Sequence, residues 1–228
     1  MQQAFDLAMV QADKSDLRFP AARRIPRVLL TGFGSFPGVA HNVSGDLVIA
    51  LAKEAQKFFP EIVIHTALLP TEWLDGPMHA LSLQDSVAPD LILHFGVAHG
   101  ADGFCIETRA VNVCRLMPDA AQLLPASALL NTAGAPFYCT TIPTDAIIAR
   151  LSALSLPVSV SDDAGGYLCN AVFYQSLDTA RATNVSRQIG FIHLPVDLSG
   201  PPLTLAQAVT GALEILKVCL SDIERAAH

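Results

Sequence analysis

The sequence predicts an α/β protein, built as a three-layer α/β/α sandwich around a mixed, mainly parallel central sheet. Short apolar runs bounded by glycine or proline alternate along the chain with longer stretches whose apolar residues recur at helical spacing. That alternation is typical of strands joined by helices that cover both faces of one sheet. The chain has 228 residues, of which 51% are hydrophobic, so it is long enough to bury one sizeable core.

We expect a single domain over residues 27–228, preceded by an N-terminal extension over residues 1–26. The extension lacks the basic start and apolar core of a secretory signal. Its apolar residues, which include Phe5 and Met9, leave three alternatives open: a short helix, a disordered segment or a segment packed on a neighbouring subunit.

The first half of the domain is predicted to contain three strands and two helices. Residues 27–31 form an apolar run between Pro26 and Gly32, which indicates a buried strand. Asn42 is a good N-cap for a helix over 43–59, which Pro60 ends. The elements that follow are a strand at 61–69, a helix at 71–87 and a buried strand at 90–96.

The loop over 32–38 places glycines directly after a strand and so invites a dinucleotide-binding interpretation. Its spacing is GxGxxxG, and Pro37 interrupts it. The next strand also ends without an acidic residue for a ribose. The sequence therefore does not favour a nucleotide cofactor.

The second half of the domain continues the alternation. Residues 103–113 read as extended structure carrying Glu107, an acid whose place on a strand calls for a partner. Thr144 is expected to cap a helix that runs to about residue 154. The remaining elements are a loop-rich stretch at 118–139, a strand at 157–161, a helix starting near 168, a strand at 188–196 and an amphipathic helix at 204–226.

A candidate nucleophile follows the small-residue turn at 164–166. The turn leads into an apolar helical pattern, which places Cys169 in or near the first helical turn. Unpaired N–H groups and the helix dipole favour a thiolate there. His193 ends an apolar strand 24 residues later, and such a pair suits a nucleophile and its base. The alternative is a buried, inert cysteine.

Composition argues against several other classes of function. The net charge is −7 and no large Lys/Arg cluster occurs, so nucleic acid is not an expected partner. No apolar run reaches the roughly 18–20 residues of a membrane helix. The five cysteines form no CxxC motif, which predicts neither a metal site nor a disulfide framework and favours the reducing cytoplasm. Only 15% of residues are charged, a composition that favours a homo-oligomer.

Four blocks of the chain, in order, resemble the pyroglutamyl peptidase I family of cysteine peptidases, also called pyrrolidone-carboxylate peptidases. They span roughly residues 27–225, and four matches in family order are far more specific than one. The blocks are TGFGSF at 31–36 with Asn42 and Ser44, PDLILHFG at 89–96 with IETRAVN at 106–112, YLCNAVFY at 167–174, and GFIHLP at 190–195.

The resemblance implies an α/β/α sandwich and a Cys–His–Glu mechanism. It makes Cys169 the nucleophile, His193 the base and Glu107 the carboxylate that orients the imidazole. It also implies that Phe33 and Phe36 line a pocket for the pyroglutamyl ring. The family's substrates are N-terminally pyroglutamylated peptides, its members need no metal or organic cofactor, and they often form homodimers or homotetramers.

The resemblance assigns Asn42, in the N-terminal block, to the substrate-binding set. Elsewhere the chain departs from the family pattern. Val97 and Ala101 replace a polar or leucine residue and an arginine, and Gly166 replaces a common threonine. The segment between Glu107 and Pro118 also looks one residue shorter than is usual in the family, which leaves the place of Arg115 open. Two alternatives therefore stand: a related cysteine hydrolase with another N-terminal or amide substrate, and a non-catalytic binding protein of the same fold.

Overall fold

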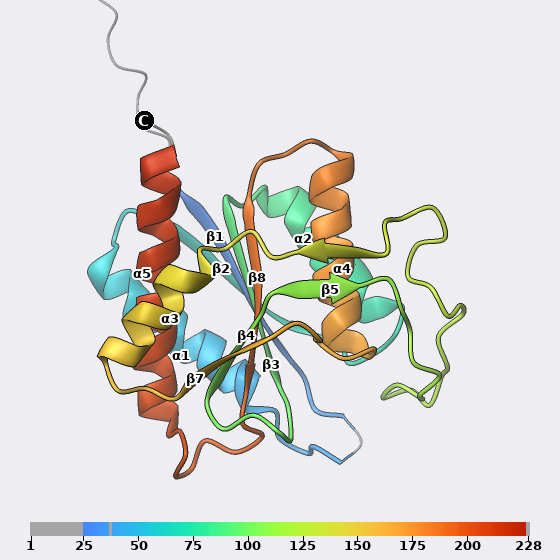
Figure 1. The fold of residues 1–228 in the computed structure, drawn as a ribbon, viewed down its shortest axis with the longest axis horizontal. Coiled ribbons are helices and arrows are strands. Elements are labelled where there is room, and N and C mark those ends of the chain that lie inside the picture. The colour runs from blue at the N-terminus through green and yellow to red at the C-terminus, as the bar shows by residue number, and fades with distance from the viewer. Residues whose placement is uncertain (1–24, 37, 227–228) are drawn as a thin grey trace, which may run out of the picture.

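The computed structural model describes residues 25–36 and 38–226 (Figure 1). Residues 1–24, which make up most of the predicted N-terminal extension, lie outside the described residues. In the described part, no helix combines the length and the apolar character that crossing a membrane requires.

A six-stranded sheet forms the middle layer, in the order β2-β1-β3-β8-β4-β7. The block from β2 to β8 is parallel, whereas β4 runs antiparallel to β8 and parallel to β7. The prediction of a mixed, mainly parallel sheet is therefore confirmed. The strands are β1 (Arg27–Phe33), β2 (Val63–Leu69), β3 (Leu91–Val97), β4 (Phe104–Glu107), β7 (Val158–Ser161) and β8 (Gln188–Leu194).

Helices cover both faces of this sheet, which confirms the three-layer architecture (Figure 1). One face is covered by α1 (Val43–Phe58), α3 (Thr144–Ala153) and α5 (Leu205–Ala226), and α5 packs against both of the others. The other face is covered by α2 (Asp75–Val87) and α4 (Leu168–Ala182), which pack together.

Strand β8 shows how the sequence fills both layers of core. Ile192 and Leu194 join the apolar cluster with α1, α3 and α5, whereas Ile189 and Phe191 join the cluster with α2 and α4. Successive side chains of a strand point to opposite faces, and a strand buried on both faces is apolar throughout. By the same alternation His193 shares the face of Phe191, beneath α4.

A second, two-stranded sheet pairs β5 (Arg109–Val111) with β6 (Phe137–Cys139) and packs against α4. The extended stretch predicted at 103–113 thus divides between two sheets. The break falls at Thr108, whose backbone N–H and hydroxyl both donate to the Ser161 carbonyl, at 2.7 and 2.9 Å. Those bonds hold the chain to β7 just before it leaves the main sheet.

Two predicted helix starts differ from the structure. The helix expected from residue 71 begins at Asp75, because the Trp73 N–H donates to Asp119 and the Thr71 carbonyl accepts from Ala120. These bonds keep 71–74 against the following loop. The expected Thr144 cap is wrong: Pro143 occupies the N-cap, and the Thr144 hydroxyl donates to the Ile142 carbonyl at 3.4 Å.

His94 is a core histidine, as its position on an apolar strand predicts. Its side chain is fully buried, with Nδ1 2.7 Å from the Thr31 hydroxyl and Nε2 3.1 Å from the Ser176 hydroxyl. Burial lowers the pKa of His94 from 6.5 to about 3. The ring is therefore neutral near neutral pH. Its two hydrogen bonds link β3, which carries it, to β1 and to α4.

Candidate active site

The three predicted catalytic residues come from three different elements. Cys169 is the second residue of α4, His193 is the penultimate residue of β8, and Glu107 is the last residue of β4. The expected helix start and strand end are therefore confirmed. All three side chains lie on the sheet face that α2 and α4 cover.

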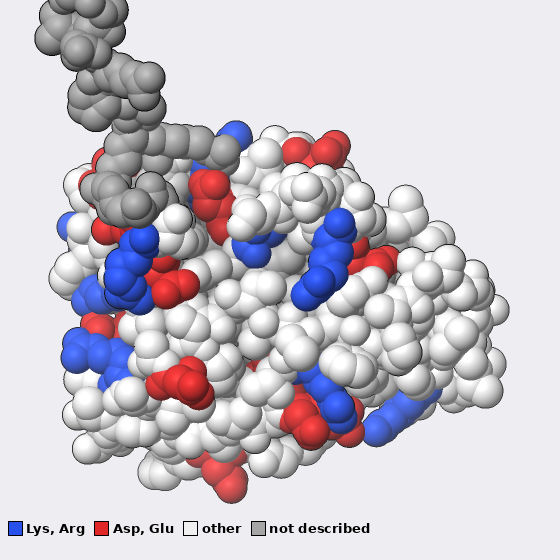
Figure 2. All heavy atoms as spheres, turned by 45° about the horizontal axis from the view of Figure 1, so that its top comes forward, with Lys and Arg blue, Asp and Glu red and all other residues white. Residues whose placement is uncertain are grey.

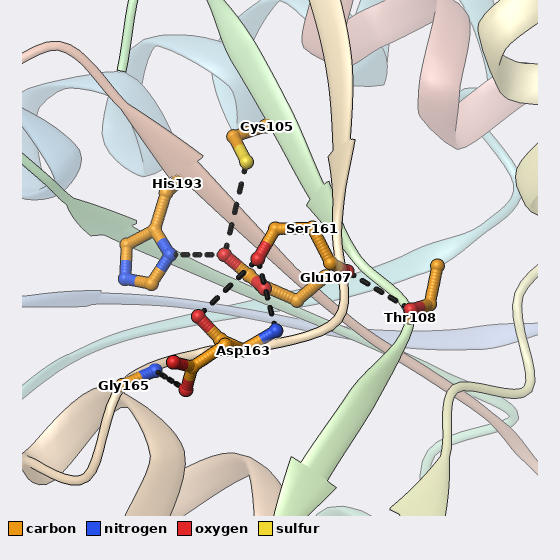
Figure 3. Close-up of polar contacts among 7 residues, drawn as sticks. All are labelled: Cys105, Glu107, Thr108, Ser161, Asp163, Gly165 and His193. Atoms are coloured by element: carbon orange, nitrogen blue, oxygen red, sulfur yellow. Dashed lines mark hydrogen bonds and ion pairs between the residues drawn. The ribbon is translucent and has the colours of Figure 1, made fainter. Parts of the chain in front are cut away.

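His193 and Glu107 form a buried pair (Figure 3). The distance from His193 Nδ1 to Glu107 Oε1 is 2.7 Å, and the two residues are 6% and 2% exposed. Glu107 lies opposite Phe191 in the antiparallel β4–β8 register, so it is a diagonal neighbour of His193 on the same face. Glu107 therefore has the partner that its place on a strand requires, and the pair leaves His193 Nε2 for the nucleophile.

The Cys169 sulfur lies over β3, beside His193. A Cβ atom placed on Gly96 would be 3.1 Å from Cys169 Sγ and 2.9 Å from Cζ of Phe191. Gly96 is the register partner of His193 on the neighbouring parallel strand. The absence of a side chain at Gly96 thus gives the sulfur room close to the imidazole.

The electrostatic balance of the site favours a charged imidazole. Burial lowers the pKa of His193, but the charges of Cys169 and Glu107, together with hydrogen bonds to both, raise it by more. The net shift of the His193 pKa is upward from 6.5. An imidazolium between two anionic partners is the state expected of a cysteine–histidine nucleophile.

The first turn of α4 offers backbone N–H groups beside the sulfur. Tyr167 is the N-cap and makes no side-chain cap bond, and the first bond of the helix runs from the Ala171 N–H to the Tyr167 carbonyl. Gly165, with φ of +77°, makes the preceding turn possible. Free N–H groups at a helix start can stabilise an oxyanion that forms on a substrate carbonyl.

The residues predicted to bind substrate lie at the end of β1, in the loop that follows it and at the N-cap of α1. Phe33 is 3% exposed and packs on Phe191, with ring centroids 6.3 Å apart, and the Phe191 centroid lies 4.8 Å from that of His193. Phe36 is half-buried and bridges to Val39. Phe33 is thus linked to the catalytic pair through one shared ring, and its role and that of Phe36 in substrate binding stay predictions.

Asn42 is the N-cap of α1, as predicted. Its Oδ1 accepts from the Ser44 N–H at 3.2 Å and from the Ser44 hydroxyl at 2.8 Å, and its Nδ2 donates to the Gly34 carbonyl at 3.1 Å. The side chain therefore fixes the loop that carries Phe36 onto the helix. A direct role of Asn42 in substrate binding stays a prediction.

Arg115 lies next to the turn before the nucleophile. Its backbone N–H donates to the Gly166 carbonyl at 2.7 Å, and a Cβ atom placed on Gly166 would be 2.7 Å from Arg115 Cγ. The arginine stem thus occupies the space that a side chain at residue 166 would need. Gly166, which replaces a common threonine of the family, is therefore packed against the arginine whose place the sequence left open.

Sequence reasoning missed Cys105 as a neighbour of the catalytic pair. Cys105 lies directly opposite His193 in the β4–β8 register, and its Sγ donates a weak hydrogen bond to Glu107 Oε1 over 3.8 Å (Figure 3). Burial raises the pKa of the Cys105 thiol, so it is a neutral donor near neutral pH. The signal was present in the sequence, because residues 105 and 107 share one face of a strand.

The donor set of the described residues does not suggest a metal centre. No group of three or more His, Cys, Asp or Glu side chains in the described part is arranged to hold a metal ion. All five cysteines fall within the described part and are free.

Comparisons with known proteins identify the family of this chain. A family model described as pyroglutamyl peptidase matches residues 26–210. The pyrrolidone-carboxylate peptidase of Yersinia pestis is 32% identical over 209 residues, which cover 89% of this chain and 96% of that protein. The pyrrolidone-carboxylate peptidase of Bacillus cytotoxicus is 28% identical over 201 residues, covering 85% and 92%.

Solved structures show the same fold. The crystal structure of Bacillus amyloliquefaciens pyroglutamyl peptidase I superposes with a TM-score of 0.76 at 25% identity, covering 86% of this chain and 97% of that one. Pyrrolidone carboxyl peptidase from Pyrococcus furiosus gives a TM-score of 0.78 at 23% identity, covering 86% and 99%. The resemblance seen in the sequence and the enzyme class that it implies are thereby confirmed: the chain belongs to the pyroglutamyl peptidase family.

Proposed function

We propose that this chain removes an N-terminal pyroglutamyl residue from peptides by acyl transfer to Cys169. The observation that carries the proposal is the buried His193–Glu107 pair, with Nδ1 and Oε1 2.7 Å apart, beside a cysteine at the start of a helix. Family membership supplies the substrate class. The chain's own residues supply the three roles of nucleophile, acid–base group and orienting carboxylate.

The first step forms the acyl-enzyme. The Cys169 thiolate attacks the carbonyl carbon of the pyroglutamyl residue, and the resulting oxyanion accepts hydrogen bonds from N–H groups of the first turn of α4. The His193 imidazolium then donates its proton to the leaving amine as the C–N bond breaks. Glu107 keeps the ring in the tautomer and orientation that this transfer requires.

The second step releases pyroglutamate. Neutral His193 removes a proton from a water molecule, which attacks the thioester carbonyl. The C–S bond breaks, the sulfur leaves as a thiolate, and the imidazole retains the proton. The site therefore returns to its starting state without a metal or an organic cofactor in the scheme.

Specificity follows from the neutral lactam ring of the substrate. Phe33 and Phe36 provide apolar contact, and backbone groups can pair with the lactam N–H and carbonyl. A glutamyl substrate would bury uncompensated charges, and a prolyl substrate would leave the partner of the lactam carbonyl unpaired. Because Val97 and Ala101 replace larger or polar family residues, we expect turnover below that of a typical member.

A panel of aminomethylcoumarin amides tests the proposal. The pyroglutamyl amide is expected to have the highest kcat/KM, ahead of the prolyl, alanyl and glutamyl amides. The kcat/KM of the prolyl amide should be lower than that of the pyroglutamyl amide by roughly 10²-fold or more, because the buried polar partner of the lactam carbonyl stays unpaired. A preference for the prolyl or alanyl amide would indicate a related cysteine hydrolase instead. No turnover of any amide, with an unreactive Cys169, would indicate a binding protein.

We further infer a homodimer or homotetramer from the lobe over residues 112–136, between β5 and β6. Figure 2 shows few charged side chains on this lobe, at the right of the view. Exposed large apolar patches mark interaction surfaces in soluble proteins. The exposed apolar side chains of the lobe and its border are Val113, Leu116, Met117, Leu123, Leu124, Leu129 and Phe137, of which Leu116 is 71% exposed.

Sedimentation measures this assembly directly. The wild type is expected to sediment at two or four times the chain mass of 24.2 kDa at micromolar concentration. Leu116→Glu combined with Leu124→Glu should shift it toward the monomer, because charge on the contact surface opposes association. A wild type that sediments as a monomer refutes the oligomer.

Cytoplasmic localisation stays a proposal, supported by the need of the Cys169 thiol for a reducing compartment.

A further inference from the structure

We propose that Asn170, the residue after the nucleophile, is a positioning residue that fixes Cys169 relative to the segment carrying Glu107. The inference rests on the proposed role of Cys169. It adds a specific side chain, outside the Cys–His–Glu set, on which the geometry of the reaction depends.

The Asn170 side chain is fully buried and binds the backbone at the end of β5 and just after it. Its Oδ1 accepts from the Val111 N–H at 2.8 Å, and its Nδ2 donates to the carbonyls of Val111 at 2.8 Å and Val113 at 3.2 Å. All three bonds span nearly 60 residues of sequence. They therefore join α4 to a segment that is remote in the chain.

The amide of Asn170 takes the place of a neighbouring strand. One edge of β5 pairs with β6, with Val111 opposite Phe137. The N–H and carbonyl of Val111 point to the other side, toward Asn170. A carboxamide carries a donor and an acceptor together, as a peptide group does, whereas a carboxylate carries acceptors only. An isosteric aspartate would thus lose two bonds and face two carbonyl oxygens.

The segment that Asn170 holds also fixes the turn before the nucleophile. Thr108 donates to the Ser161 carbonyl, and the Arg115 N–H donates to the Gly166 carbonyl at 2.7 Å. Figure 3 follows the turn from Ser161 through Asp163 to Gly165, whose N–H donates to Asp163 Oδ1 at 3.0 Å. Residues 108–115 therefore form hydrogen bonds with the chain both before and after Cys169.

This arrangement sets the distance between nucleophile and base. The segment begins directly after Glu107, which holds His193, and it ends at Arg115, which binds the turn before the helix that carries Cys169. Asn170 directly follows Cys169, and its side chain makes the bonds that join α4 to Val111 and Val113. A displacement of about 1 Å in a catalytic group can cost about 10²-fold in rate. Loosening the start of α4 should therefore reduce chemistry more than substrate binding.

Asn170→Asp tests the inference, with Gln84→Glu as its matched control. Gln84, on α2, is 2% exposed and also binds backbone of α4 through its amide, with Nε2 donating to the Ser176 carbonyl at 3.2 Å. Both variants should lower the melting temperature. Only Asn170→Asp should lower kcat, by about 10- to 100-fold with little change in KM, and lower the rate of Cys169 alkylation by iodoacetamide to a similar extent.

Four outcomes would contradict these proposals. A folded Asn170→Asp with wild-type kcat and alkylation rate overturns the inference, and so does an equal kcat loss in Gln84→Glu. If Asn170→Asp does not fold, Asn170→Ser takes its place, because serine keeps one donor and one acceptor. Its kcat should be lower than that of the wild type, and a wild-type kcat overturns the inference. Alkylation of wild-type Cys169 no faster than of exposed Cys139 overturns the proposed function itself.

Discussion

Cys169→Ser is expected to abolish hydrolysis of the pyroglutamyl amide while leaving the fold intact. The thiol is replaced by a hydroxyl that is hardly ionised near neutral pH, so His193 loses the anion it would pair with. Loss of a nucleophile that acts with a base costs at least about 10⁴-fold in kcat. The smaller oxygen fits above Gly96, where the sulfur already packs closely. Steady-state kinetics and circular dichroism measure the two parts of this expectation.

The control for this variant is Cys139→Ser. Cys139 is an exposed thiol at the end of β6, and its loss should leave kcat unchanged. Mass spectrometry after limited iodoacetamide treatment should find Cys169 modified first, in step with the loss of activity. If activity instead disappears as Cys105, Cys114 or Cys139 is modified, the assignment of the nucleophile is wrong.

Much of the site could be predicted from local sequence. A small-residue turn before an apolar helical pattern locates Cys169 in the first turn of α4, and an apolar run between Gly190 and Pro195 locates His193 at a strand end. Asn42 as the N-cap of α1 follows from the same kind of local rule. These features depend on neighbours within a few residues, and a sequence shows those directly.

The pairing of the elements could not be predicted in this way. The antiparallel register of β4 and β8 places Glu107 and Cys105 beside His193, and register depends on contacts between distant segments. The break at Thr108 and the delayed start of α2 likewise depend on hydrogen bonds to Ser161 and Asp119. Asn170 looks like an ordinary helical residue in the sequence, because its partners lie nearly 60 residues away.

His193→Ala and Glu107→Gln are expected to reduce turnover unequally. Removing the imidazole removes the proton donor for the leaving amine and should lower kcat by about 10³- to 10⁴-fold. Glutamine can still accept a hydrogen bond from Nδ1 but cannot stabilise the imidazolium, so Glu107→Gln should cost less. His79→Ala, at an exposed histidine on α2, is the matched control and should retain full activity. Equal, mild losses for the two site variants would place the active site elsewhere.

The pH profile of Glu107→Gln gives a second, independent test. Glu107 and Cys169 hold the pKa of His193 above its ordinary value, so the wild type keeps its imidazolium until the pH rises through that raised pKa. Glutamine removes one of the two anionic neighbours and lowers the His193 pKa. The alkaline fall of kcat/KM should therefore move to lower pH in the variant, while the profile of His79→Ala stays unchanged. If the alkaline limb lies at the same pH in Glu107→Gln and the wild type, the Glu107 carboxylate does not raise the pKa of His193. The 2.7 Å contact between the two side chains would then hold the ring in place without affecting its charge.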